Sequence, residues 1–208
     1  MATVLNTSEQ RVLLRGVSWE TYSRLAAERQ ESSGTRLCYD LGTLEILSPS
    51  FKHENLKETI TRVFQLIADE MTITFQGVGS TTFRREDLGK GFEPDACFYI
   101  RHAQDVRGKE EIDLNIDPPP DLVIEIDIAK SSLNKLALYA AAGVPEVWRY
   151  SGSLLKILHL KGQGYVEEAQ SLSLPHITST TLTDLVESSH ETDRDVWIRL
   201  VRASAKKI

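Results

Sequence analysis

Two acidic residues lie inside apolar runs whose composition is typical of buried strands. Asp95 precedes the run 96–100, and Glu125 stands in the middle of the run 122–128. An ionised carboxylate among apolar neighbours is costly unless a cation or several hydrogen bonds satisfy it. Mg²⁺ usually takes only one or two carboxylates from a protein, and it keeps its other positions for water and phosphate. If the two strands are neighbours, Asp95 and Glu125 therefore predict a metal site that activates water for attack on a phosphate.

Each acid also has an ordinary structural explanation. Asp95 follows a proline and can be a solvated acid at the start of a strand. Glu125 can belong to a structural salt bridge. Its central position in an apolar run favours the functional interpretation, because burial there demands a cation or a strong set of hydrogen bonds.

Charged side chains after the second run can complete such a site. Asp127 lies two residues beyond Glu125, on the same face of the predicted strand, and is either a third metal ligand or an exposed strand end. Lys130 follows on a predicted loop, and Lys135 lies in the next predicted helix. A lysine close behind two acids can touch a phosphate, so both lysines are candidate catalytic residues.

His53 and Glu54 open another predicted helix. Helical spacing aligns His53 with the apolar face and turns Glu54 about 100° away from it. Glu54 can reach an adjacent metal site from there, which makes it a further catalytic candidate. Both residues can equally be ordinary members of a first helical turn, since acids are favoured near helix N-termini.

Periodicity and turn residues predict the elements that position these groups. Ser18 is a suitable N-cap for a helix over 19–30, and apolar residues at helical spacing predict a longer helix over 53–71. Gly42 divides a hairpin over 36–47, and Gly143 ends a helix over 132–142. Further strands are expected at 72–76, 80–84, 96–100 and 121–128, an antiparallel meander over 146–168, and helices at 180–187 and 193–203. Mixed elements of this kind indicate an α/β fold.

Length and composition are those of an ordinary soluble domain. The 208 residues suit one domain over 1–208, with an N-terminal arm at 1–15 and C-terminal helices within 180–208. The sequence has no apolar stretch long enough for a bilayer and no signal-peptide pattern at its start, so the cytoplasm is expected and no membrane partner. The net charge of -6 argues against a general nucleic-acid binder, because such binding rests largely on basic residues.

Other kinds of chemistry find little support. The glycines match neither a P-loop nor a dinucleotide-binding pattern, which excludes NTP hydrolysis and hydride transfer. No serine stands in a G-x-S-x-G turn. Cys38 and Cys97, the two cysteines of the chain, lie in apolar strand-like runs, where a thiol behaves as a small buried hydrophobe.

Several motifs together resemble the bacterial Uma-type endonuclease family, whose fold is similar to that of restriction endonucleases of the PD-(D/E)XK superfamily. The resemblance runs from about residue 19 to residue 150. The matching segments are Gly42-Thr43-Leu44-Glu45-Ile46-Leu47-Ser48-Pro49-Ser50 with His53, Glu93-Pro94-Asp95, Pro120-Asp121-Leu122-Val123-Ile124-Glu125-Ile126, and Lys135-Leu136-Ala137-Leu138-Tyr139 with Gly143-Val144-Pro145-Glu146-Val147-Trp148.

The resemblance implies a central mixed β-sheet flanked by α-helices and a magnesium-dependent phosphodiesterase site, in which Mn²⁺ can substitute. Asp95 matches the first metal-binding acid, Glu125 the second, and Glu54 an acid that many relatives carry on the first core helix. The superfamily pattern places a lysine where this chain has Asp127. Lys135 is the expected substitute, with Lys130 as the second candidate. Nucleases of this fold often act as homodimers, and a homodimer is expected here.

Two functions from different classes follow. The first is a metal-dependent endonuclease that hydrolyses DNA phosphodiester bonds with water activated by Mg²⁺ on two acids beside a lysine. The alternative is a catalytically silent nuclease-fold protein that binds nucleic acid or a protein partner. Asp127 at the lysine position and the net acidity favour the alternative.

Overall fold

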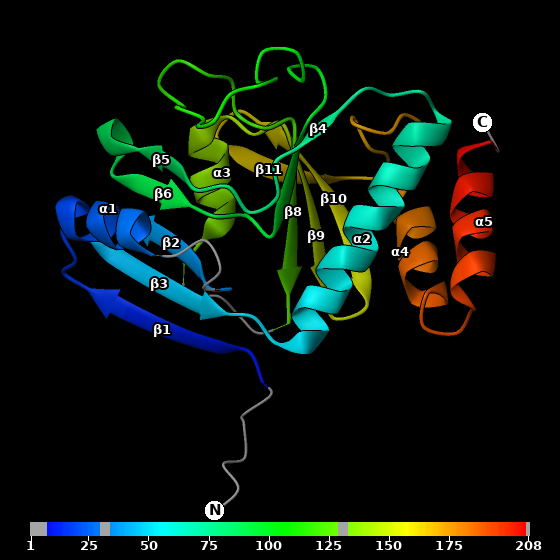
Figure 1. Ribbon diagram of the computed structural model, residues 1–208, viewed down its shortest axis with the longest axis horizontal. Coiled ribbons are helices and arrows are strands. Elements are labelled where there is room, and N and C mark those ends of the chain that lie inside the picture. The colour runs from blue at the N-terminus through cyan, green and yellow to red at the C-terminus, as the bar shows by residue number, and fades with distance from the viewer. Residues whose placement is uncertain (1–7, 30–33, 129–132, 207–208) are drawn as a thin grey trace, which may run out of the picture.

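The strands form two sheets that lie side by side, with helices packed around them (Figure 1). The computed structural model describes residues 8–29, 34–128 and 133–206. Sheet A has five antiparallel strands in the order β1-β3-β2-β6-β5. Its strands are β1 (Gln10–Arg15), β2 (Arg36–Asp40), β3 (Thr43–Ser48), β5 (Phe83–Arg85) and β6 (Lys90–Phe92).

Sheet B has six strands in the order β11-β10-β9-β8-β7-β4. They are β4 (Gln76–Gly77), β7 (Ala96–Tyr99), β8 (Leu122–Asp127), β9 (Glu146–Ser151), β10 (Leu154–Lys161) and β11 (Gly164–Glu168). Strands β8 and β9 run parallel, and the other neighbours pair antiparallel. The prediction of a mixed sheet with an antiparallel meander is confirmed, whereas the second sheet was not predicted.

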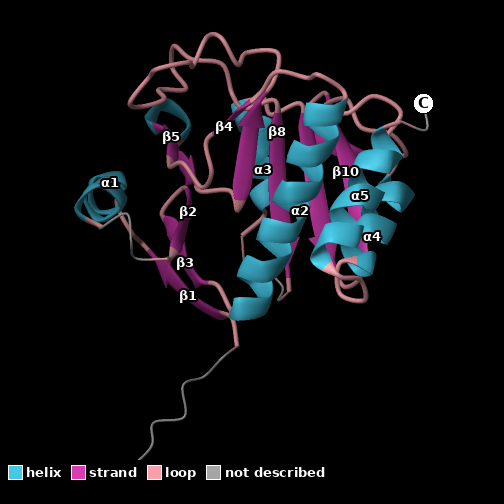
Figure 2. Cartoon of the chain, turned by 45° about the vertical axis from the view of Figure 1, so that its right-hand side comes forward, coloured by secondary structure: helices cyan, strands magenta, loops and turns pink. Residues whose placement is uncertain are grey.

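The described residues form five α-helices, which pack against the sheets (Figure 2). Helix α1 (Trp19–Glu28) packs on sheet A, and α3 (Lys135–Ala142) lies between the two sheets. The face of sheet B that points away from α3 is covered by α2 (Phe51–Glu70), α4 (Ser179–Ser188) and α5 (Arg194–Ala205). A short 3₁₀ turn occupies Glu86–Leu88. None of the described helices combines the length and the apolar character needed to cross a membrane.

Side-chain alternation along β8 divides the core into two layers. Ile124 and Ile126 pack with α2 and its neighbours, whereas Val123 packs toward α3. On the α2 side the rings of Phe64 and Phe98 lie 4.1 Å apart between their centroids. Because residues two apart share a strand face, Glu125 is directed to the same side as Val123, toward α3. The alternation of side chains along β8 therefore directs the Glu125 carboxylate toward α3.

Several predicted boundaries shift for local reasons. Helix α3 begins at Lys135 rather than at 132, because the Asn134 side chain caps it by accepting a hydrogen bond from the Ala137 amide. The strands expected at 72–76 and 80–84 shorten to β4 and β5. Part of the expected N-terminal arm, residues 10–15, instead forms β1, an edge strand paired with β3.

Gly91 lies where Tyr22 of α1 packs against sheet A, and it gives the first prediction. A Cβ atom at this position would lie 2.1 Å from the Tyr22 hydroxyl oxygen and 2.5 Å from its Cζ atom. We expect Gly91→Ala to lower the free energy of unfolding by about 1–3 kcal/mol, because the fully buried ring has no room to move. Urea denaturation measures this loss.

Tyr22→Phe provides the matched control. No hydrogen-bond partner for the Tyr22 hydroxyl is found in the described part of the chain, so removing that oxygen alone should change stability little. Combined with Gly91→Ala it should recover part of the loss, since it removes the atom closest to the new methyl group. Strictly additive effects of the two substitutions would contradict this explanation.

Candidate active site

Asp95 and Glu125 come close together where β7 begins to pair with β8. Ala96, the first residue of β7, pairs with Ile124, and Asp95 immediately precedes it. The Asp95 Oδ2 atom also accepts a hydrogen bond of 2.8 Å from the Ile126 amide. The side chains are nearly inaccessible, with residue exposures of 1% and 3%.

Helix α3 supplies two donors to Glu125. The Lys135 Nζ atom lies 2.7 Å from Glu125 Oε2, and the Tyr139 hydroxyl donates to Glu125 Oε1. Because residues four apart lie on one helix face, the first turn of α3 presents both donors to β8 together. Lys135 is the first residue of α3. In the predicted helix over 132–142 it would have lain about one turn inside. Both oxygens of Glu125 are hydrogen-bonded.

Burial and neighbouring charges perturb the acid-base properties of this cluster. Burial, together with the charge of Asp95, raises the pKa of Glu125 to about 7 despite the nearby ammonium of Lys135. Burial opposes the charge of Lys135, but the carboxylates of Glu125 and Asp95 raise its pKa above the ordinary value. Burial also opposes ionisation of Asp95, yet the hydrogen bond from His53 and the charge of Lys135 lower its pKa. Burial is therefore the main cause that opposes ionisation of Glu125, and the charge of Asp95 adds to it.

His53 joins the site from the first turn of α2. Its Nε2 atom lies 2.8 Å from Asp95 Oδ1, and its Nδ1 atom lies 2.7 Å from Glu9 Oε2. The helix starts where the Ser50 side chain accepts a hydrogen bond from the His53 amide, which sets the ring at the edge of sheet B. Although burial opposes its charge, the two carboxylates raise the pKa of His53. Sequence reasoning placed His53 on the apolar helix face but assigned it no role in the site.

The other candidate residues fall in different surroundings. Asp127 points toward Arg149, with 2.5 Å between Oδ2 and Nε, beside Glu125 on the same pocket. Glu54 is not brought to the acid pair and forms ion pairs with Arg36 at 3.4 Å and Lys57 at 2.5 Å. Lys130 lies outside the described residues. Within the described ranges, no three histidine, cysteine, aspartate or glutamate side chains gather into a group able to hold a metal ion.

A small pocket gives solvent a route to Glu125. Its volume is about 130 Å³, and its charged lining comes from Glu125, Asp127, Lys135 and Arg149. Arg149 is the most open of these groups, with 43% of its side chain exposed. The pocket thus combines the buried pair of Glu125 and Lys135 with the exposed guanidinium of Arg149, an arrangement suited to an anion that approaches from outside.

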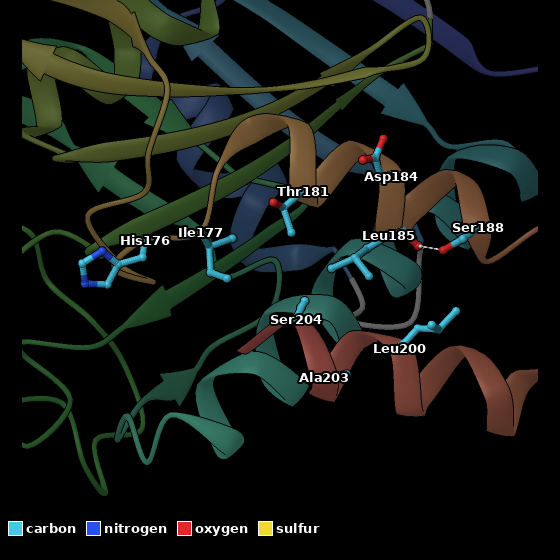
Figure 3. A pocket seen from close by; sticks show the side chains of 9 residues that line it. All are labelled: His176, Ile177, Thr181, Asp184, Leu185, Ser188, Leu200, Ala203 and Ser204. Carbon is cyan, nitrogen blue, oxygen red and sulfur yellow. Dashed lines mark hydrogen bonds between the residues drawn. The ribbon is translucent and has the colours of Figure 1, made fainter. Parts of the chain in front are cut away.

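A larger cavity of about 780 Å³ lies between α4 and α5, away from the acids (Figure 3). Hydroxyl groups and leucines dominate its lining, and the Ser188 hydroxyl is already hydrogen-bonded to the Leu185 carbonyl. Asp184 and His176 lie at separate ends of the view in Figure 3. The acid cluster beside β8 is therefore the better candidate for chemistry, despite the smaller size of its pocket.

Comparisons with known proteins bear on the fold and the family of the chain. The chain is similar in structure to a protein from Anabaena variabilis ATCC 29413, described as "a putative nuclease belonging to DUF820", with a TM-score of 0.53 and 18% identity over 77% of this chain and 96% of that one. No match was found among curated proteins. The family model Uma2, described as "Putative restriction endonuclease", matches residues 19–187 and includes the strands and helices that carry Asp95, Glu125 and Lys135. The chain belongs to the Uma2 family.

Proposed function

We propose that the chain is a divalent-cation-dependent endonuclease that hydrolyses phosphodiester bonds of DNA. The observation that carries this proposal is the placement of Asp95 beside Glu125, where the Ile126 amide donates to Asp95 and the Lys135 ammonium contacts Glu125. Family membership and the shared fold support a nuclease-like function and a nucleic-acid substrate. The choice of DNA, of Mg²⁺ as the natural ion and of Mn²⁺ as its substitute belongs to the proposal.

The residues beside β8 fit a hard divalent cation. Asp95 and Glu125 offer carboxylate oxygens, and each oxygen keeps lone pairs beyond the one hydrogen bond it accepts. Burial raises the pKa of Glu125 to about 7 and the charge of Asp95 adds to this, so a cation bound by the two carboxylates would favour their charged forms. Asp95 and Glu125 would hold the ion. When bound, such an ion supplies an acidified water and withdraws charge from a phosphate.

The remaining side chains of the pocket have defined tasks in this proposal. Lys135 holds Glu125 in place and presents an ammonium to a phosphate oxygen. Tyr139 donates to the other Glu125 oxygen, which fixes the carboxylate between two donors. Asp127 orients Arg149 by a 2.5 Å contact, and the exposed guanidinium can receive the nucleic-acid backbone. Asp127 therefore serves here as a support for Arg149 rather than as a third metal ligand.

The position of Lys135 also bears on the catalytically silent alternative. That alternative rests on Asp127 standing at the position of the superfamily lysine. An ammonium reaches Glu125 all the same, from the first turn of α3. This contact favours the active nuclease, because the positive charge expected behind the second acid is present at 2.7 Å.

The test is cleavage of circular plasmid DNA with Mg²⁺ or Mn²⁺ by the wild-type chain and by Asp95→Asn and Glu125→Gln. We expect nicked and then linear products with the wild type, and losses of roughly 100-fold or more in both variants, as for removal of an electrostatic stabiliser. Chelation of the metal should stop cleavage by the wild type.

Glu146→Gln is the matched control, because Glu146 is also a fully buried acid in sheet B. It starts β9 opposite Leu122, at the far end of β8 from the proposed site, so its variant should keep cleavage activity. Cleavage that survives in both site variants would falsify the site assignment. A wild type that cuts no DNA with either ion would favour the silent alternative.

A further inference from the structure

The segment that begins sheet A reaches into the candidate site although it lies outside the family match. The match covers residues 19–187, whereas Glu9 immediately precedes β1 and Arg11 is the second residue of that strand. Glu9 contacts His53 of α2, and His53 contacts Asp95, the residue before β7. The edge strand of one sheet is therefore connected, through a single histidine ring, to the acid pair of the other.

Both ends of this connection are tightly held. Glu9 uses Oε2 for the 2.7 Å contact with His53 and Oε1 for contacts of 2.8 and 2.9 Å with the Arg11 guanidinium. The same guanidinium lies 2.7 Å from Glu45 Oε1 on β3, which faces β1 in sheet A. Glu9 cannot turn away from His53 without breaking its bonds to Arg11, so β1 fixes the position of the carboxylate.

His53, held by Glu9, in turn holds the Asp95 carboxylate. The side chains of His53 and Glu9 are 0% and 2% exposed, so water cannot replace either partner without local opening. Each ring nitrogen faces one carboxylate oxygen, with 2.7 Å to Glu9 Oε2 and 2.8 Å to Asp95 Oδ1. Asp95 then has Oδ1 held by His53 and Oδ2 held by the Ile126 amide. These bonds on its two oxygens set the plane of the carboxylate relative to Glu125.

We propose that Glu9 and His53 are positioning residues of the nuclease site, which orient Asp95 for the divalent cation, and that β1 is thereby a working part of the site. The role toward the cation rests on the proposed function. The competing explanation is that the chain of contacts merely joins the two sheets. The two differ in what a conservative substitution changes, because joining the sheets affects stability alone.

The first experiment measures Mn²⁺ binding by isothermal titration with the wild type, Glu9→Gln, His53→Gln and the control Glu146→Gln. We expect roughly 10–100-fold weaker binding in the Glu9 and His53 variants, as for loss of hydrogen bonds that orient metal ligands. Glu146→Gln should bind Mn²⁺ as the wild type does, although it also removes a buried charge. Equal affinity in Glu9→Gln and the wild type would overturn the role toward the cation.

The second experiment needs neither metal nor activity. The ¹H–¹⁵N resonance of the Ile126 amide reports the hydrogen bond to Asp95 Oδ2, and it should shift in metal-free Glu9→Gln and His53→Gln but not in Glu146→Gln. An unchanged Ile126 resonance would overturn the positioning of Asp95. If the wild type shows no Asp95-dependent Mn²⁺ binding, the proposed function fails, and the Ile126 resonance still decides whether Glu9 and His53 orient Asp95.

Discussion

Replacing Lys135 with methionine is expected to destabilise the metal-free protein by about 3–5 kcal/mol, because it leaves Glu125 buried without its cation. Lys135 is 8% and Glu125 3% exposed, so solvent offers little compensation. Methionine keeps most of the side-chain volume, which confines the change to the charge. Urea denaturation of both proteins at neutral pH measures the difference in the free energy of unfolding.

The pH dependence of this loss has a defined sign. Burial already raises the pKa of Glu125 to about 7, and removal of the ammonium raises it further. The unfolded chain keeps an ordinary carboxyl pKa of about 4.3, so the folded variant binds the extra proton. The wild type itself should lose stability as the pH rises from about 4.3 to about 7, whereas Lys135→Met should continue to lose stability above pH 7, so the difference between the two proteins should widen there. A loss that is independent of pH would show that the charge of Glu125 is not its cause.

The double variant Lys135→Met with Glu125→Gln separates charge from packing. A neutral amide in place of the carboxylate removes the unpaired charge, so the double variant should be more stable than Lys135→Met alone near neutral pH. Its stability should also vary less with pH, because the titrating carboxyl is gone. If the double variant were as unstable as the sum of the single variants, the two side chains would not be coupled.

Glu146→Ala should cost about 3–5 kcal/mol, because it leaves several buried donors without an acceptor, at roughly 1–3 kcal/mol each. Glu146 is fully buried and accepts from Trp148 Nε1 at 2.9 Å and from the Ser173 amide at 2.8 Å. It also accepts from the Leu172 amide and the Ser173 hydroxyl. This carboxylate fastens the segment before α4 to sheet B. Chemical denaturation measures the loss.

Limited proteolysis adds a local measurement. In Glu146→Ala the segment 171–174 should become the first point of cleavage, since its amides have lost the carboxylate that holds them. Glu146→Gln keeps one acceptor oxygen and should lose less stability than Glu146→Ala. Equal stability of the alanine variant and the wild type would mean that these hydrogen bonds contribute nothing net.

Some local features of this fold could be predicted from the sequence, because a single residue type there favours one local structure. Ser18 caps a helix as predicted, because a short hydroxyl side chain accepts a hydrogen bond from a first-turn amide, whereas the same role of Ser50 was not predicted. Gly42 and Gly143 turn the chain at positive φ. The acids in the two apolar runs also stood out, since burial of a carboxylate requires partners. The sequence therefore located the strands of the site.

The partners of those acids depend on contacts between distant parts of the chain. The register of β7 against β8 brings Asp95, just before β7, to the Ile126 amide beside Glu125, and a shift by one residue would turn the side chains of one strand to the other face. His53 meets Glu9 and Asp95 across 44 and 42 residues, where sequence spacing carries no geometric information. Glu54, its neighbour, turns instead to Arg36 and Lys57, because one step along a helix rotates a side chain by about 100°. The residue types in the sequence were enough to identify the two acids. The packing of α2, α3 and β1 around β8 decided which groups surround them.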